Sequence, residues 1–208
     1  MRLQLQYPVK VVHFNQYFGQ NATGVYKAQG MPGHNGIDFM APHGTPVYAS
    51  HDGIASFQID SNGGHGVVII TNEQFEYDGG VSYMKTIYWH LVDGLKEPKF
   101  MSPIADKTGF VAVKAGDLIG YADNTGISTG DHLHYGLKPV AQGENQWIWY
   151  NVEQKNGYNG AIDPLPYLTK ETKPVVLASW YQKFLDIIKR DNLIEYSPQL
   201  GRWVYKKK

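Results

Sequence analysis

The sequence lacks cysteine, a net charge of either sign and any long hydrophobic run. The absence of cysteine among 208 residues excludes disulfides, thiolate metal sites and a cysteine nucleophile. Basic and acidic residues both number 19, so no global field draws the chain to nucleic acid or to an anionic membrane. Nothing approaches ~18 consecutive apolar residues, so we expect no membrane span. Any metal ion must be held by nitrogen and oxygen ligands.

Two familiar sequence signals are missing as well. The N-terminal stretch MRLQLQYPVKVVHF has neither the apolar core nor the small-residue cleavage site of a secretory signal peptide. The motif HExxH occurs nowhere, so the glutamate base of the common metalloprotease helix is absent. Proton transfer in a hydrolytic site would therefore fall to other side chains, of which histidine is the most suitable.

What the sequence does contain is a series of short apolar or alternating runs separated by glycine- and proline-rich turns. This pattern is typical of an all-β fold, here a twisted antiparallel sheet. The predicted strands cover residues 36–40, 46–50, 53–60, 66–71, 82–91, 117–122 and 132–139.

Longer intervals interrupt the predicted strands and differ from them in composition. Residues 72–80, 92–113 and 141–161 do not match a strand pattern, and we expect them to form loops that border a groove. Residues 175–190 have the apolar spacing of an amphipathic helix. The sequence thus predicts a β domain over residues 1–170 and a C-terminal helical appendage with a tail over residues 171–208.

Residues 130–137, GDHLHYGL, place two histidines one position apart in a predicted strand. Side chains alternate between faces along a strand, so His132 and His134 share a face, with Cα atoms ~6.6 Å apart. Leu133 points to the opposite side, toward apolar packing. Paired imidazoles suit a metal ion and a proton-transfer partner, but exposed strands also carry such pairs without any chemical role.

A second polar group lies in residues 33–49, GHNGIDFMAPHGTPVYA. His34 and Asp38 are four residues apart, and the surrounding glycines indicate a loop that leads into a strand rather than a helix. Asp38 is flanked by apolar residues, where an unpartnered carboxylate is costly. We expect it to be hydrogen-bonded, paired or bound to a cation; a turn or sheet-edge role with bonds to backbone amides is the alternative.

A further histidine, His90, ends the predicted strand that also contains Tyr88. A single histidine in such a place is more often a buried structural residue than a catalyst. The other histidines lie in turns or at strand edges, where we expect surface positions without a catalytic role: His13, His43, His51 and His65.

The combination of these polar residues indicates a metal site. Two neutral imidazoles and one carboxylate leave a divalent cation with an open position for water, as in catalytic zinc sites. Such a site activates water and polarises a carbonyl oxygen, which favours hydrolysis. The same ligand set also suits ferrous iron in an oxygenase.

Four segments resemble the lysostaphin-type, or LytM-like, zinc endopeptidases, which cut peptides of bacterial peptidoglycan. These segments are GHNGIDFMAPHGTPVYASHDG, IYWHL, VKAGDLIGYADNTGISTGDHLHYGL and IDPLPYL, which occur in the family order between residues ~12 and ~168. By the family pattern, one zinc ion per chain is bound by His34, Asp38 and His134, and His90 and His132 assist catalysis. Tyr26 and Tyr88 are additional hydrogen-bond donor candidates, although an aromatic ring is more often a packing residue.

The resemblance implies a zinc metalloendopeptidase that acts on peptidoglycan cross-links or stem peptides at the bacterial cell wall. A bacteriophage lysin or virion-associated hydrolase fits a short chain without a visible signal peptide, and the C-terminal segment is a candidate for attachment to a larger assembly. The alternative is a non-catalytic module of the same fold that binds the cell wall or regulates a partner. Tyr135 and Gly136 replace the phenylalanine and glutamate that commonly follow the HxH motif, a change that concerns packing around the site.

Overall fold

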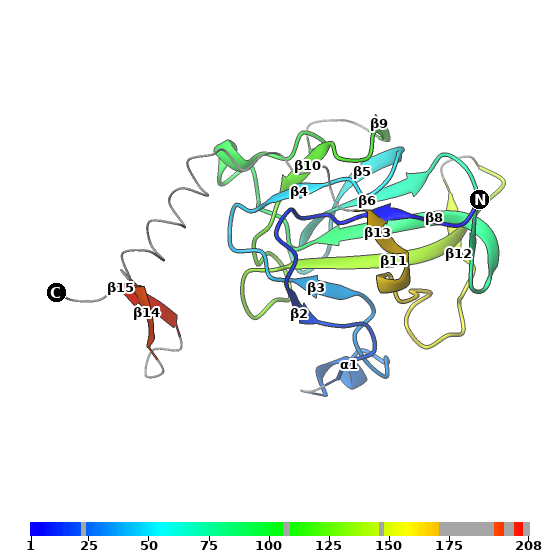
Figure 1. Cartoon of the computed structure of the whole chain (residues 1–208). Helices are drawn as coiled ribbons and strands as arrows, with labels where there is room; N and C mark the ends of the chain where they lie inside the picture. The colour runs from blue at the N-terminus through cyan, green and yellow to red at the C-terminus, as the bar shows by residue number, and fades with distance from the viewer. Residues whose placement is uncertain (22–23, 106–108, 146–147, 171–193, 198–201, 206–208) are drawn as a thin grey trace. The chain divides into compact units, whose positions relative to one another are not determined.

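The computed structural model describes residues 1–21, 24–105, 109–145, 148–170, 194–197 and 202–205. Most of the secondary-structure elements in these residues are strands (Figure 1). All seven predicted strands are present: β3 (Ile37–Phe39), β4 (Pro46–Tyr48), β5 (Gly53–Ile59), β6 (His65–Thr71), β8 (Gly80–Trp89), β10 (Leu118–Tyr121) and β11 (Leu133–Gln142). The predicted all-β fold with antiparallel pairing is therefore confirmed.

Several shorter elements were not predicted. The additional strands are β1 (Leu5–Gln6), β2 (Phe14–Gln16), β7 (Phe75–Tyr77), β9 (Val111–Val113), β12 (Trp149–Asn151) and β13 (Leu168–Lys170). The helical elements in this part are α1 (Val25–Ala28) and the 3-10 turns η1 (Pro98–Phe100) and η2 (Leu165–Tyr167). The expectation that residues 72–80, 92–113 and 141–161 contain no strands is wrong, since β7, β9 and β12 lie in them. Each of these strands has three residues. Strands β3 and β4 are equally short, but they lie within the five-residue runs 36–40 and 46–50 that the sequence pattern singled out.

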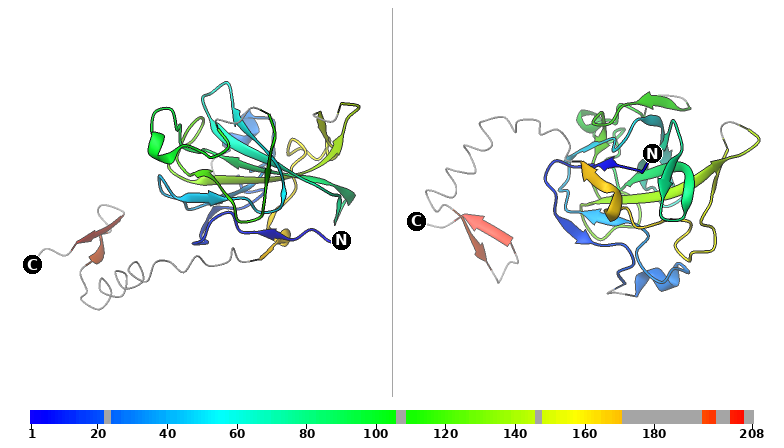
Figure 2. Two further views of the ribbon diagram at one scale, coloured as in Figure 1. Left: turned by 90° about the horizontal axis from the view of Figure 1, so that it is seen from above. Right: turned by 45° about the vertical axis from the view of Figure 1, so that its right-hand side comes forward.

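One sheet organises the fold, with the strand order β2-β3-β11-β8-β6-β5-β9 and with β7 and β12 paired to β8 and β11. All of its neighbouring strands are antiparallel. Two smaller ribbons, β4 with β10 and β1 with β13, complete the first part of the chain (Figures 1 and 2). The two longest strands, β8 and β11, lie side by side at the centre of the large sheet.

The hydrophobic core lies on one face of the large sheet. The alternation of β8 buries Met84, Thr86 and Tyr88 and leaves the residues between them half-buried. On β11, Tyr135 and Leu137 point to the same core. Buried residues of the small ribbons cover this face, namely Leu5, Val47, Ile119 and Leu168. The opposite, outer face of the sheet carries the half-buried residues of these strands, both polar and apolar.

A polar network crosses the core behind the sheet. His51 is buried; its Nδ1 donates to the Asp52 carbonyl at 2.9 Å, and its Nε2 lies 2.9 Å from the Thr86 hydroxyl. Thr86 in turn bonds the Tyr88 hydroxyl at 3.1 Å. The expected surface position of His51 is thus wrong, and so is that of His65, which is 8% exposed because it begins β6 and packs against Phe57.

The chain divides into two compact units, Met1–Thr172 and Lys173–Lys208. In the second unit the structure describes an antiparallel pair, β14 (Ile194–Ser197) and β15 (Arg202–Tyr205), which was not predicted. The predicted helix over 175–190 lies outside the described residues. The assignment of a catalytic domain to residues 1–170 and of an appendage to 171–208 stays a prediction. Among the described residues, no helix has the length and apolar character needed to cross a membrane.

We predict that His51 makes the fold acid-sensitive. Burial is the main cause that lowers the pKa of His51 from 6.5 to about 4. Since its folded pKa lies below its unfolded value, the contribution to stability is complete above pH 6.5 and is lost as the pH falls through 4. The full effect amounts to about 3 kcal/mol. Urea denaturation of the wild type and of His51→Gln between pH 7 and pH 4 measures it.

The variant should show a shallower loss of unfolding free energy with falling pH than the wild type. Replacement of the exposed His13 by glutamine controls for the removal of a histidine. Equal pH slopes for His51→Gln and the wild type would contradict the prediction.

Candidate metal centre

Two adjacent strands position the first two site residues. In the antiparallel pair of β3 and β11, Asp38 lies directly opposite His134. Facing residues of an antiparallel pair point to the same side of the sheet, so both side chains extend from its outer face. His34 precedes β3 and is only 2% exposed; its backbone NH donates to the Gln20 carbonyl and its carbonyl accepts from Gly19. These two bonds bring the loop back over the sheet.

Three side-chain atoms converge at this point. His34 Nε2 lies 2.9 Å from His134 Nδ1 and 3.1 Å from Asp38 Oδ1, and His134 Nδ1 lies 3.2 Å from Asp38 Oδ1. Ligand atoms that bind one zinc ion tetrahedrally at bond lengths of ~2.0–2.1 Å are ~3.3 Å apart. The observed triangle is close to that size and offers two imidazole nitrogens and one carboxylate oxygen. The donor set therefore fits a divalent metal ion.

The charge state of Asp38 agrees with this use. Burial alone would raise the pKa of Asp38, but hydrogen bonds from His134 and His34 outweigh it and hold the pKa well below its usual range. Burial lowers the pKa of His134, so its imidazole is neutral at pH 7. The site thus combines an ionised carboxylate with the neutral imidazole of His134, and neutral imidazole is the form in which histidine binds metals.

His90 and His132 form a second pair beside the three converging atoms. Their ring centroids are 4.6 Å apart. His90 Nδ1 donates to the Thr125 carbonyl at 2.7 Å, and His132 Nδ1 donates to the Gly130 carbonyl at 2.8 Å. These bonds keep a proton on each Nδ1 and leave each Nε2 as the free atom. His132 Nε2 lies 3.7 Å from Asp38 Oδ1.

The backbone of His90 is unusual. Its φ angle of 64° lies in the left-handed region, which is uncommon for residues other than glycine. Its carbonyl accepts a hydrogen bond of 2.7 Å from the Asp123 NH, and its ring is fixed by Thr125. Burial lowers the pKa of His90 to about 4, so this ring is also neutral at pH 7. Strain of this kind at a polar site is typical of a functional residue.

Of the two tyrosines considered, only Tyr26 lies at the site. Its ring centroid is 5.3 Å from that of His34, and its hydroxyl donates to Gln16 Oε1 at 2.9 Å. Burial and the charge of Asp38 raise the pKa of Tyr26 to about 12, so it remains a hydrogen-bond donor. Tyr88 points to the core instead and accepts from the Ser50 NH, because its strand position faces away from the site.

The sequence pattern did not single out Trp89. This residue pairs with His134 across the sheet on one side and with Gly66 on the other. A Cβ on Gly66 would collide with the Trp89 ring, and one on Gly64 would lie 2.7 Å from Trp89 Nε1. Gly64 and Gly66 thus leave room for the indole ring.

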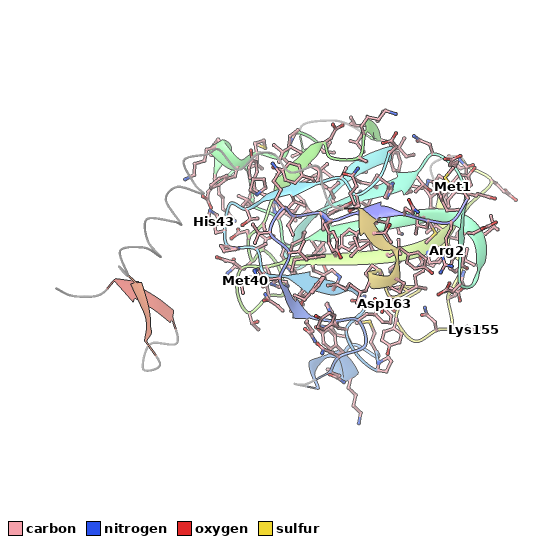
Figure 3. All side chains as sticks on the ribbon, viewed as in Figure 1. Met1, Arg2, Met40, His43, Lys155 and Asp163 are labelled. Carbon is pink, nitrogen blue, oxygen red and sulfur yellow. The ribbon has the colours of Figure 1, made fainter. Side chains whose placement is uncertain are left out.

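A second cluster lies at the turn between β3 and β4, where Figure 3 labels Met40 and His43. His43 Nδ1 lies 2.9 Å from Asp123 Oδ1, and its Nε2 lies 3.2 Å from Glu97 Oε2. The two ring nitrogens thus contact different carboxylates. One ligand atom from each of His43, Glu97 and Asp123 lies within 4.8 Å of the other two, so this cluster is a second group that could hold a metal ion. The predicted surface position of His43 is confirmed, and its lack of a catalytic role stays a prediction.

Residues 32–146, more than half of the chain, match Peptidase family M23. The chain belongs to this family. The M23 match includes all five histidine and aspartate residues of the site, and it agrees with the predicted lysostaphin-type resemblance.

Curated relatives and solved structures extend the comparison. The chain is 38% identical over 102 residues to the DD-carboxypeptidase/endopeptidase Mpg of Neisseria meningitidis, which covers 49% of this chain and 19% of the relative. It is 39% identical over 104 residues to the peptidoglycan DD-endopeptidase ShyA of Vibrio cholerae, and the match covers 50% of this chain and 20% of the relative. The chain therefore spans about a fifth of the length of these relatives. The antimicrobial peptidase lysostaphin of Staphylococcus simulans shares its fold at a TM-score of 0.52 and 24% identity, covering 81% of this chain and 55% of that one.

Gly36 tests how closely the M23 site is packed. A Cβ at this position would lie 2.6 Å from the Tyr135 carbonyl oxygen and 2.7 Å from His134 Cε1. We predict that Gly36→Ala shifts His134, lowers zinc affinity at least tenfold and destabilises the fold by about 1–3 kcal/mol. Competition with a chromophoric chelator and urea denaturation measure the two effects. Gly130→Ala, which would meet no atom within 4 Å, is the control. If both variants bind zinc equally well, the packing argument is wrong.

Proposed function

We propose that this chain is a zinc-dependent endopeptidase that hydrolyses stem or cross-link peptides of bacterial peptidoglycan at the cell wall. His34, Asp38 and His134 would bind the zinc ion, one per chain, and His90 and His132 would assist the reaction. The observation that carries the proposal is the convergence of one carboxylate oxygen and two imidazole nitrogens within 2.9–3.2 Å of one another. Membership of family M23 and the named peptidoglycan endopeptidases among the relatives support it.

A zinc ion bound there supplies Lewis acidity toward water and toward the peptide carbonyl. The chain's own contribution is proton transfer. His132 carries a proton on Nδ1, so its Nε2 is free to accept a second one. The resulting imidazolium would lie 3.7 Å from the Asp38 carboxylate, which stabilises it. His132 is therefore a better candidate than His90 to accept a proton from water and to pass it to the leaving amine.

His90 has a different part in this scheme. Burial keeps the His90 ring neutral, and its Nδ1–H donates a hydrogen bond to the Thr125 carbonyl. A neutral ring of this kind positions His132, whose ring it contacts, and presents its own Nε2 to the reacting groups. Because a buried imidazolium is costly here, His90 is suited to orientation and hydrogen bonding more than to holding a second proton.

The outer face of the sheet supports a peptide as the substrate. Half-buried apolar side chains extend from the site across it, namely Trp89 and Ile87 on β8 and Val68 on β6. A polypeptide in extended conformation fits such a strip. Its backbone NH and C=O groups then remain available for hydrogen bonds with the polar groups around the strip. The suggested bacteriophage or virion origin stays a prediction, as does attachment to a larger assembly through the C-terminal segment.

Removal of the metal should abolish the activity reversibly. We predict that chelation with 1,10-phenanthroline and dialysis stops peptide release from purified peptidoglycan, and that one equivalent of zinc restores it. The new amino termini are counted by dinitrophenylation, with zinc content measured by atomic emission. Full activity of protein shown to be metal-free would contradict the proposal.

Two substitutions should separate metal binding from proton transfer. Asp38→Ala removes a proposed ligand, so it should lower both zinc content and turnover. His132→Ala removes the proposed proton acceptor, so turnover should fall about 10²–10⁴-fold while zinc content is unchanged. Mass spectrometry of products from defined muropeptides, together with metal analysis of each variant, measures both quantities. Unchanged turnover in His132→Ala, or full zinc content in Asp38→Ala, would overturn these assignments.

A further inference from the structure

A pair of lysines lies on the same face of the sheet as the metal centre. On β11 and β8 the register runs from His134 opposite Trp89 to Lys138 opposite Lys85. Because positions 134 and 138 differ by four, an even number, their side chains point to the same side of the sheet. No register shift interrupts this pair of strands, so both lysines extend from the outer face.

The ammonium groups of Lys85 and Lys138 are neighbours, and neither has an acidic partner among the described residues. Side chains directly opposite each other on antiparallel strands have Cβ atoms ~4.5–5.5 Å apart, and like charges in such a pair are destabilising. Both lysines are half-buried, and neither side chain forms an ion pair or a hydrogen bond with any residue in the described part of the chain. By contrast, Lys114 binds Asp52 at 2.8 Å, and Lys96 binds Asp93 at 3.0 Å.

The protonation behaviour of the pair agrees with its geometry. Burial lowers the pKa of Lys85. Burial, followed by the charge of Lys85, lowers the pKa of Lys138 to about 8. The fold thus tolerates two cations that partly lose hydration and repel each other. An anion placed between them would reduce the repulsion and accept charge-assisted hydrogen bonds from both ammonium groups.

The position of the pair relates it to the metal centre. Lys138 follows His134 by four residues along β11, a distance of ~13 Å. A peptide in extended conformation covers the same distance in about four residues. Between the two sites the outer face carries Gly136 and the half-buried Ile87, so no bulky charged side chain from these strands intervenes.

We propose that Lys85 and Lys138 form an anion subsite that binds a carboxylate of the substrate peptide three to four residues from the bond that is cut. The inference rests on the proposed peptidase function. The subsite makes this chain selective for acidic peptides over their amidated counterparts.

The experiment compares two peptides and four forms of the full chain. The peptides are a peptidoglycan stem peptide with free carboxylates and the same peptide with its carboxylates amidated. The proteins are the wild type, Lys85→Gln, the double variant Lys85→Gln/Lys138→Gln, and Lys114→Gln as a control with the same charge change on a lysine that already has a carboxylate partner. Binding is measured by calorimetry at low salt, and hydrolysis is measured separately.

We expect the wild type and Lys114→Gln to bind the acidic peptide about tenfold or more tightly than the amidated one, the range of a charge-assisted hydrogen bond. The preference should shrink in Lys85→Gln and vanish in the double variant, which should hydrolyse the amidated peptide as fast as the wild type does. An acid-to-amide ratio that is the same in the double variant and the wild type would overturn the subsite, as would failure of the wild type to bind either peptide. A lysine-dependent ratio without hydrolysis would support the subsite and refute the peptidase function.

Discussion

The register between β3 and β11 is the constraint on which the candidate metal centre depends. It places Asp38 directly opposite His134 and turns both side chains to the outer face of the sheet. A slip of one residue would move either side chain to the core, because side chains alternate along a strand. The same register buries Leu133 and Tyr135 on the inner face. Core packing on one side therefore holds the ligand atoms on the other side in place.

This division between two faces explains the distribution of polar residues. On the inner face, Thr86 and Tyr88 satisfy each other and the buried His51, and they take no part in the site. On the outer face, His134 belongs to the metal centre, and Lys138 on the same strand belongs to the proposed anion subsite. The pair of long strands β8 and β11 thus carries one residue of the metal centre, His134, together with most of the strip along which we propose the peptide lies and the two lysines that would select that peptide.

Sequence patterns predicted the longer strands because alternation leaves a local signal. The five candidate site residues were singled out by their combination and by the resemblance to a known family, since a lone histidine such as His90 leaves no signal of its own. Strand β8 alternates over ten residues, and the spacing of His132 and His134 fixes their common side without any structure. Short strands such as β7, with three residues, leave no such signal. The burial of His51 and the fit of Trp89 over Gly66 depend on partners far away in the sequence. The cross-strand pairing of Lys85 with Lys138 could likewise be found only once the register was known.

We propose that His34, Asp38 and His134 hold one metal ion. The most direct test of this proposal is anomalous diffraction at the zinc absorption edge from crystals of the zinc-loaded protein. We expect a single strong peak ~2.0–2.2 Å from His34 Nε2, an Asp38 carboxylate oxygen and His134 Nδ1. A zinc peak at the cluster of His43, Glu97 and Asp123 with none between these three atoms would contradict it.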